Sequence, residues 1–357
     1  MKLPCITMLA TLLLTAPAAA QLQITPPATT PSAAPEKQKP KPHTITKKKE
    51  AAPAPKPSAS PKPASSPKPA TVIPAPSTDN SSVDLVFGAY QRGQYKTAFD
   101  LATARAQAGD PKAMTMLGEL YSNAMGMRRD YAKAAEWYKR AADAGDREAM
   151  FALSMLRISG RGGPIDKSEA VKLMASAAKL GEPRAAYNLA LLYLDGQTLP
   201  QDVKRSAELL RQAADAGLPE AQYALATFYK EGTGVPKDAE RSVRLLQAAS
   251  LADNVDAEVE YAIAMFNGTG TPKNQPAAVA LLRKASRQGS AIAQNRLAWV
   301  LINGVGTSVD KVEGFKWHLV AKTAGKGDPE LDKQLSDLPA EDRAKAEAAA
   351  KKWLGTK

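Results

Sequence analysis

Cysteine and histidine are almost absent from this sequence. Its one cysteine, Cys5, lies within residues 1–20, and its two histidines are His43 and His318. Without residues 1–20 the chain has no disulfide, no thiol nucleophile and no cysteine ligand for a metal. The sequence also contains no HExxH, no GxSxG and no glycine-rich phosphate loop that follows a strand. We therefore expect no catalytic residue, no metal site and no small-molecule cofactor.

Long apolar runs are equally scarce. Residues 1–20 combine Lys2, an apolar run from Ile6 to Leu14 and the small residues Ala18 to Ala20. This pattern is typical of a secretory signal peptide that is cleaved after Ala20. The run is shorter than the ~18 residues that a membrane span needs, and no other segment reaches that length. We expect an exported protein; the alternative is a chain that an uncleaved N-terminal segment anchors to the inner membrane.

Large apolar side chains are rare in residues 21–80. This segment holds fifteen of the 27 prolines, and its nine lysines oppose only Glu36, Glu50 and Asp79. Such a composition cannot bury enough apolar surface to offset chain entropy, so it predicts a disordered linker with polyproline II character. The linker is either a solubilising spacer or a segment attracted to an anionic cell-wall or membrane surface. Nucleic acid is not an expected partner, because the chain carries an export signal.

What the remaining sequence does contain is a strict period of 36 residues. Glycine recurs with this period from Gly109 to Gly325, and only Asp253 interrupts the column, which reads Gly109, Gly145, Gly181, Gly217, Asp253, Gly289, Gly325. Two further columns are alanine throughout: Ala113, Ala149, Ala185, Ala221, Ala257, Ala293 and Ala141, Ala177, Ala213, Ala249, Ala285, Ala321. Six consecutive units without an insertion predict an all-α solenoid, in which each unit buries its apolar face against its neighbours.

Each unit has the pattern of two helices. In the fourth unit, Ala221, Leu225 and Tyr229 are spaced by four and predict the apolar stripe of a first helix. Gly232 ends that helix, and Asp238 has the position of the N-cap of a second one. The same cap column reads Asp130, Asp166, Asp202, Asp238, Asn274, Asp310, and a small-residue column reads Gly118, Ser154, Ala190, Ala226, Ala262, Ala298. Small residues permit close helix approach, so the unit is predicted to be an antiparallel αα-hairpin.

The repeated sequence closely resembles the Sel-one-like repeat family, a relative of the tetratricopeptide repeat. The resemblance rests on three patterns: A-x-x-x-L-[small]-x-x-Y, G-x-G-x-P-x-D and W-Y-x-x-A-A-x-x-G. The resemblance covers residues 109–325 and implies a right-handed αα-superhelix of six units. The aromatic pair is kept at Trp137-Tyr138, and Trp317 restores its tryptophan in the last unit. Leucine replaces that tryptophan in the four middle units, at Leu173, Leu209, Leu245 and Leu281.

Both ends of the array are predicted to be capped by helices. Residues 81–108 look like a half-matching hairpin that opens the array, with a tight turn at Gly93. Residues 326–357 hold a short helix from Asp328-Pro329 and a longer one after Pro339. His318 falls in the column of Tyr138 and Leu282, so a packing role is favoured over catalysis.

The first helices of tetratricopeptide relatives line the concave side of the superhelix, and the resemblance extends this expectation to the present chain. The aligned positions hold a partner-binding strip, namely Phe151, Met155, Tyr187, Leu191, Tyr223, Ile263, Phe266, Trp299. We expect this strip to bind an extended or helical segment of a protein partner. The alternative is that these side chains only complete the packing between adjacent units.

The resemblance therefore implies a non-enzymatic scaffold or adaptor in the bacterial cell envelope, most simply in the periplasm. One alternative is a cell-wall or polysaccharide-binding protein that acts through the basic linker. Another is a β-lactamase-like penicillin-binding hydrolase, an activity ascribed to cysteine-rich relatives. The hydrolase is disfavoured, because the mature chain has no cysteine.

Overall fold

The computed structural model describes residues 81–355, and of residues 81–84 it describes the backbone alone. The expected signal peptide, residues 1–20, and the expected linker, residues 21–80, lie outside the described residues. Between residues 81 and 355 the chain forms sixteen helices and no strand. The all-α solenoid expected from the sequence is confirmed.

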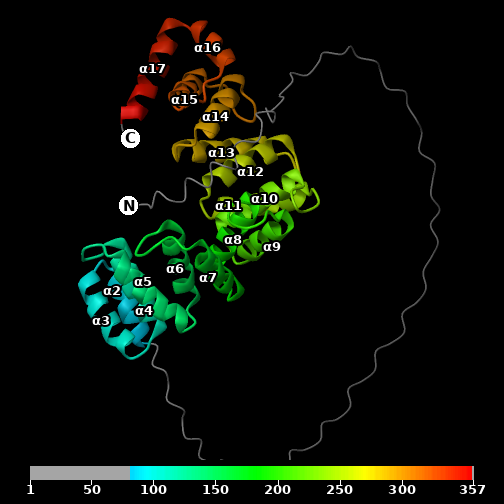
Figure 1. Cartoon of the computed structure of the whole chain (residues 1–357). Coiled ribbons are helices and arrows are strands. Elements are labelled where there is room, and N and C mark those ends of the chain that lie inside the picture. Colours follow the sequence, from blue (N-terminus) through cyan, green and yellow to red (C-terminus); the bar gives the residue numbers. More distant parts are fainter. Residues whose placement is uncertain (1–80, 356–357) are drawn as a thin grey trace, which may run out of the picture. The chain divides into compact units, whose positions relative to one another are not determined.

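The helices follow one another as pairs (Figure 1). The opening pair is α2 (Ser81–Gln91) and α3 (Tyr95–Gln107). The first helices of the six units are α4 (Pro111–Asn123), α6 (Arg147–Ser159), α8 (Pro183–Asp195), α10 (Pro219–Glu231), α12 (Val255–Asn267) and α14 (Ala291–Asn303). The second helices are α5 (Tyr131–Asp143), α7 (Lys167–Lys179), α9 (Val203–Asp215), α11 (Ala239–Leu251), α13 (Gln275–Arg287) and α15 (Lys311–Thr323). The closing pair is α16 (Pro329–Ser336) and α17 (Ala340–Gly355).

The start of every second helix is fixed by a side-chain cap. Asp130 Oδ1 accepts a hydrogen bond of 3.0 Å from the backbone amide of Lys133. The equivalent bond is made by every other member of the column, which are Asp166, Asp202, Asp238, Asn274 and Asp310. These bonds satisfy an amide that the helix itself leaves unpaired. The recurrent acidic column is confirmed as a set of caps.

The end of every first helix is a residue in the left-handed region. Five units use glycine there, at Gly160, Gly196, Gly232, Gly268 and Gly304. In the first unit Ala124 adopts the same conformation with a φ of 58°. A β-carbon makes this region unfavourable, which is why the loop column is predominantly glycine.

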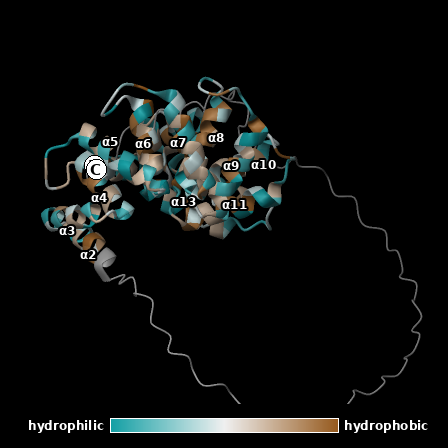
Figure 2. Ribbon diagram, turned by 60° about the horizontal axis from the view of Figure 1, so that its bottom comes forward, coloured by the Kyte–Doolittle hydropathy of each residue, from teal (hydrophilic) through white to brown (hydrophobic). Residues whose placement is uncertain are grey.

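The alanine columns form the contact surfaces between helices. All twelve alanines are buried, and eleven of them expose no surface. Hydrophobic and hydrophilic residues alternate along the helices in Figure 2, as expected for helices that bury one stripe. Small side chains in these columns allow consecutive helices to pack closely, and each helix from α2 to α15 packs against the next.

The helices α4 and α5 approach each other very closely at Gly118 of α4. A β-carbon built at this position would lie 2.5 Å from Cε1 of Tyr138 in α5. The neighbouring units have alanine or serine at the equivalent position, opposite smaller residues such as Leu210 and Leu282. Glycine and tyrosine are therefore matched to each other in the first unit.

The closing helices cover the last unit. The α17 residue Trp353 packs edge-on against Trp317 of α15, with ring centroids 5.0 Å apart. Lys316 lies over both rings, 4.2 Å and 5.5 Å from their centroids. Such a terminal helix shields apolar surface that an open solenoid would expose. Within the described part of the chain, no helix is both long and apolar enough to cross a membrane.

Candidate functional site

The predicted partner-binding strip lies on five of the first helices, α6, α8, α10, α12 and α14. Phe151, Tyr187 and Tyr223 share one helix position. Met155, Leu191, Ile263 and Trp299 share the position one turn later, and Phe266 comes almost one further turn along α12. All eight side chains are half-buried. The structure therefore places them on equivalent faces of successive first helices.

Seven of the eight side chains also support the core. Phe151, Met155 and Tyr187 pack against the buried cluster centred on Leu189 and Leu210. Ile263, Phe266 and Trp299 pack against the cluster of the last two units, and Tyr223 packs beside Leu246. Leu191 belongs to none of these described clusters. The strip thus combines packing between units with surface that stays accessible, and Leu191 is its member least tied to the core.

Arginine covers the N-terminal end of the strip. The guanidinium of Arg184 lies 5.1 Å from the ring centroid of Phe151, and its Nε donates to Glu182 at 2.7 Å. Glu182 is buried at the start of α8, and Arg147 approaches it at 3.9 Å from the preceding unit. These contacts tie α6 and α8 together while leaving a cation over an aromatic face, an arrangement that is favourable when partly desolvated.

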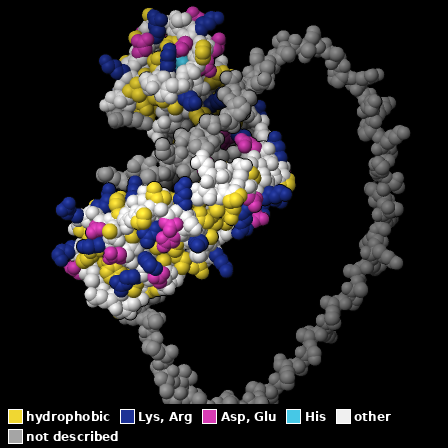
Figure 3. Space-filling model, viewed as in Figure 1, with side chains coloured by type: hydrophobic (Ala, Val, Ile, Leu, Met, Phe, Trp, Pro, Cys, Tyr) yellow, Lys and Arg dark blue, Asp and Glu magenta, His cyan; other side chains and the backbone are white. Residues whose placement is uncertain are grey.

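Carboxylates border the strip further along. Glu260 of α12 forms an ion pair with Lys230 of α10, with 2.8 Å between Oε2 and Nζ. This pair links two successive units. Burial raises the pKa of the Tyr223 hydroxyl, and the negative charges of Glu260 and Asp256 raise it further. Burial likewise raises the pKa of Tyr187, with a smaller effect from Glu220. Basic and acidic side chains are interspersed over the face shown in Figure 3.

The first unit departs from this pattern. Glu119 occupies the helix position that holds Met155 and Leu191 in the next two units. Burial raises the pKa of Glu119, and the neighbouring Glu148 adds to the effect. At the opposite end, burial lowers the pKa of Arg296 in α14. The apolar strip therefore begins at α6, because α4 presents a carboxylate there.

Sequence reasoning missed these bordering charges. Arg184, Lys230 and Glu260 each lie on a first helix, but the aromatic partner of Arg184 and the ionic partners Lys230 and Glu260 lie on successive first helices. The only signal in the sequence was a charged residue on a first helix, which by itself does not identify a partner. The Arg184–Phe151 contact joins α8 to α6, and the Lys230–Glu260 contact joins α10 to α12.

The described residues hold no arrangement that suggests a metal site. No group of three metal-ligating side chains comes together between residues 81 and 355. His318 is fully buried in α15, and its Nε2 lies 2.8 Å from Oδ1 of Asp332. This histidine therefore joins α15 to α16, in agreement with the packing role expected for it.

The chain is an αα-solenoid, because its helical pairs recur at a fixed period with the same caps, left-handed turns and small-residue columns. Proteins of this repeat class are typically non-catalytic scaffolds for protein interactions. The Sel1 repeat family matches six consecutive segments, residues 111–146, 147–182, 183–218, 219–254, 255–290 and 291–326. The chain belongs to the Sel1 repeat family. These segments have the 36-residue period seen in the sequence, with each unit starting two residues later than Gly109 and its equivalents.

Among the solved structures that are similar to the chain, two have a TM-score above 0.6. A protective antigen present in uropathogenic Escherichia coli strains, which displays an SLR fold, is 26% identical with a TM-score of 0.66. That match covers 77% of this chain and 60% of the antigen. A Sel1 repeat protein from Oxalobacter formigenes is 26% identical with a TM-score of 0.61, over 68% of this chain and 99% of that protein. No curated protein matches the sequence.

Proposed function

We propose that this protein is a non-enzymatic adaptor of the bacterial cell envelope, which binds a segment of a partner protein along its first helices. The observation that carries the proposal is the partner-binding strip. Its side chains recur at equivalent helix positions in several units, and all remain half-buried instead of fully buried. A surface built only for packing between units would bury them, as it buries the alanine columns.

The chemistry of the strip indicates what the partner presents. Phe151, Met155, Tyr187 and Leu191 offer aromatic and aliphatic surface across two successive first helices, α6 and α8. Glu220 and Asp256 add negative charge farther along the array. Apolar anchors with charged neighbours suit an amphipathic or extended segment that carries both apolar and basic side chains. The mixed strip therefore favours a peptide partner over a small polar ligand.

Export is part of the same proposal. The proposal of export rests on the N-terminal sequence, which has the pattern of a signal peptide. Fractionation of cells that produce the full chain tests this part. We expect the mature protein in the periplasmic fraction, cleaved after Ala20. Recovery of the intact chain in the cytoplasm would contradict it.

The binding face is tested by site-specific photo-crosslinking in the full-length chain. A photoreactive phenylalanine analogue replaces Leu191 in one variant and Arg244, exposed on the second helix α11, in the control. We expect one discrete crosslinked partner from position 191 and none from position 244. Equal crosslinking from both positions, or none from position 191, contradicts binding on the first helices.

The linker is tested separately in the full chain. Replacing the nine lysines of residues 21–80 by glutamine removes its charge but keeps its length. If the adaptor proposal is right, the crosslink from position 191 persists in this variant. Loss of the crosslink together with loss of salt-sensitive sedimentation on isolated cell wall would favour the polysaccharide-binding alternative instead.

A further inference from the structure

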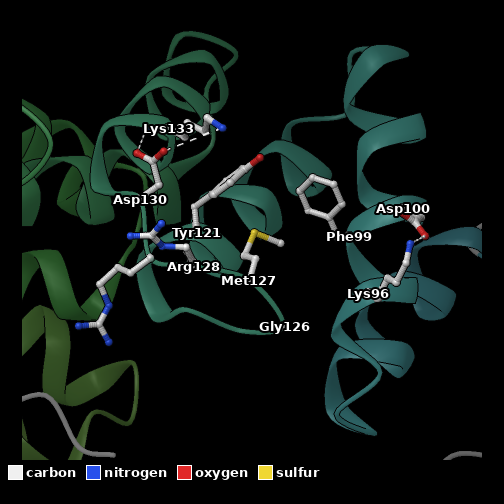
Figure 4. Close-up of a pocket in the computed structure, with 10 residues that line it drawn as sticks. Lys96, Phe99, Asp100, Tyr121, Gly126, Met127, Arg128, Asp130 and Lys133 are labelled. Carbon is white, nitrogen blue, oxygen red and sulfur yellow. Dashed lines mark hydrogen bonds and ion pairs between the residues drawn. The ribbon is translucent and has the colours of Figure 1, made fainter.

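A second surface feature lies in the first unit, away from the partner-binding strip. A hollow of ≈ 670 Å³ opens between α3, the end of α4, the loop before α5 and the first turn of α5. Its wall includes Lys96, Phe99, Tyr121, Met127, Arg128 and Lys133. In Figure 4, Phe99, Met127 and Tyr121 lie between the Lys96–Asp100 pair on one side and Arg128 with Lys133 on the other.

Positive charge exceeds negative charge in this hollow. Four basic residues line it, against the two carboxylates of Asp100 and Asp130. Asp100 is paired with Lys96 at 3.1 Å. Asp130 already caps α5 and lies 4.0 Å from the ammonium group of Lys133. Both carboxylates are thus engaged by groups of the chain itself.

The two arginines of the loop are the uncompensated charges. Arg128 and Arg129 are both exposed. Arg129 lies over the ring of Tyr131 at 5.7 Å, and among the described residues neither arginine forms an ion pair with a carboxylate. Guanidinium groups without a carboxylate partner are the usual recognition elements for carboxylates and phosphates.

The hollow also has apolar walls. The rings of Phe99 and Tyr121 meet edge to face, with their centroids 5.8 Å apart. Lys133 lies 5.4 Å from the Tyr121 centroid, so its charge is held at the rim. The half-buried side chain of Met127 lies beside them. A group that enters this hollow therefore meets apolar surface below and cations around the edge.

The corresponding loops of the later units do not have this composition. The position of Arg128 is proline in four of them, at Pro164, Pro200, Pro236 and Pro272, and Ser308 in the last. In the second unit the residues that correspond to Tyr121 and Lys133 are Arg157 and Glu169, which neutralise each other in an ion pair of 2.7 Å. The double arginine thus marks the first unit alone.

We propose that this hollow binds an acidic segment of a partner protein, with carboxylates on Arg128, Arg129 and Lys133 and an apolar side chain against Phe99, Met127 and Tyr121. The charge of the rim supports an acidic occupant, and the recessed apolar walls support a side chain that enters. A lipid bilayer would meet the exposed arginines but would leave the walls of the hollow uncovered. A protein segment is therefore the better fit.

The test uses a fluorescently labelled eight-residue peptide of alternating glutamate and leucine, titrated with the full chain. We expect saturable binding, and no binding of a matched peptide with lysine in place of glutamate. Arg128→Glu with Arg129→Glu should weaken binding by about tenfold or more, because two charge-assisted contacts are lost. Serine in place of leucine in the peptide should weaken it as well.

The matched control is Lys237→Glu with Lys273→Glu. Both lysines are exposed at the position equivalent to Arg129 in later units, and the change of net charge is the same. Full binding by this control supports a specific site, whereas equal weakening by both double variants overturns it in favour of diffuse attraction. Absence of peptide binding by the natural chain overturns it too. So does arginine-dependent binding to phosphatidylglycerol vesicles without any peptide binding, which would assign the arginines to a membrane surface.

Discussion

The ammonium group of Lys284 in α13 lies 2.7 Å from the carboxylate of Asp253, the one residue that interrupts the glycine column. Asp253 has a φ of 59°, so it keeps the left-handed conformation of the glycines it replaces. Lys284 also bonds Glu258, which is fully buried in α12. One lysine thus pairs with two carboxylates, that of Asp253 in the left-handed turn and that of the buried Glu258.

Replacing Lys284 by methionine should destabilise the protein. The charge of Glu258 would then stay buried without its cation, and we expect a loss of about 1–3 kcal/mol in the free energy of unfolding. Urea unfolding followed by circular dichroism measures this loss. The control is the double variant Lys284→Met with Glu258→Gln, because Gln222 and Gln294 occupy the equivalent position and donate to backbone carbonyls. Failure of the second change to restore stability would contradict the role of Glu258.

The pairing of Gly118 with Tyr138 gives a second prediction. Gly118→Ala should destabilise the natural chain by ~1–2 kcal/mol, because overpacking against the tyrosine ring outweighs the better helix propensity of alanine. In a Tyr138→Leu background the same change should stabilise, since leucine lies opposite alanine in other units. A double-mutant cycle on unfolding free energies measures the reversal of sign. Equal effects in both backgrounds would show that the two positions do not interact.

Much of the fold was predictable because it repeats. Each column of the period reports one physical requirement six times, so the caps at Asp130 and its equivalents and the left-handed residues at Gly160 and its equivalents could be assigned from residue type alone. The residues that depart from a column could be seen in the sequence, but their structural role could not be predicted from it. Asp253 broke the column in the sequence, yet its partner Lys284 lies two helices later on α13, and the period does not show that these two side chains meet.

The candidate site was predictable only in part for the same reason. Helical spacing predicted that Phe151, Tyr187 and Leu191 share one face of the first helices, and in the structure all three are half-buried on α6 and α8. It did not show that Arg184 would cover Phe151, or that Lys230 would reach Glu260 in the following unit. Such contacts depend on the distance between neighbouring first helices, which a one-dimensional pattern does not contain. The hollow beside Arg128 was missed because one of its walls, α3, belongs to the opening helical pair, outside the repeat.

The contact between His318 and Asp332 predicts a pH dependence of stability. Hydrogen bonds from Lys322 and His318 lower the pKa of the Asp332 carboxyl below its ordinary value. The ionised carboxylate is therefore favoured in the folded state, and its stabilising effect is complete above the unfolded pKa of ~3.9. This effect is lost as the pH falls through the lowered folded pKa.

Asp332→Asn should accordingly be less stable than the natural chain at pH 7, and the difference should shrink below about pH 4. Urea unfolding at several pH values measures both quantities. The control is Asp215→Asn at the exposed end of α9, which should leave the pH profile unchanged. A constant difference between Asp332→Asn and the natural chain across this range would show that the contact does not depend on ionisation.

The partner-binding strip itself is tested most cleanly at Leu191. Because this half-buried side chain belongs to none of the described core clusters, Leu191→Glu should leave helicity unchanged and the melting temperature nearly so, and should abolish partner binding. Trp299→Glu should also abolish binding, but it should lower the melting temperature by several degrees, since Trp299 packs against the last core cluster. Thermal melts and the crosslinking yield of each variant separate the two effects. If Leu191→Glu unfolds the protein, the side chain belongs to the core; if it folds and still binds the partner, the strip is not the binding surface.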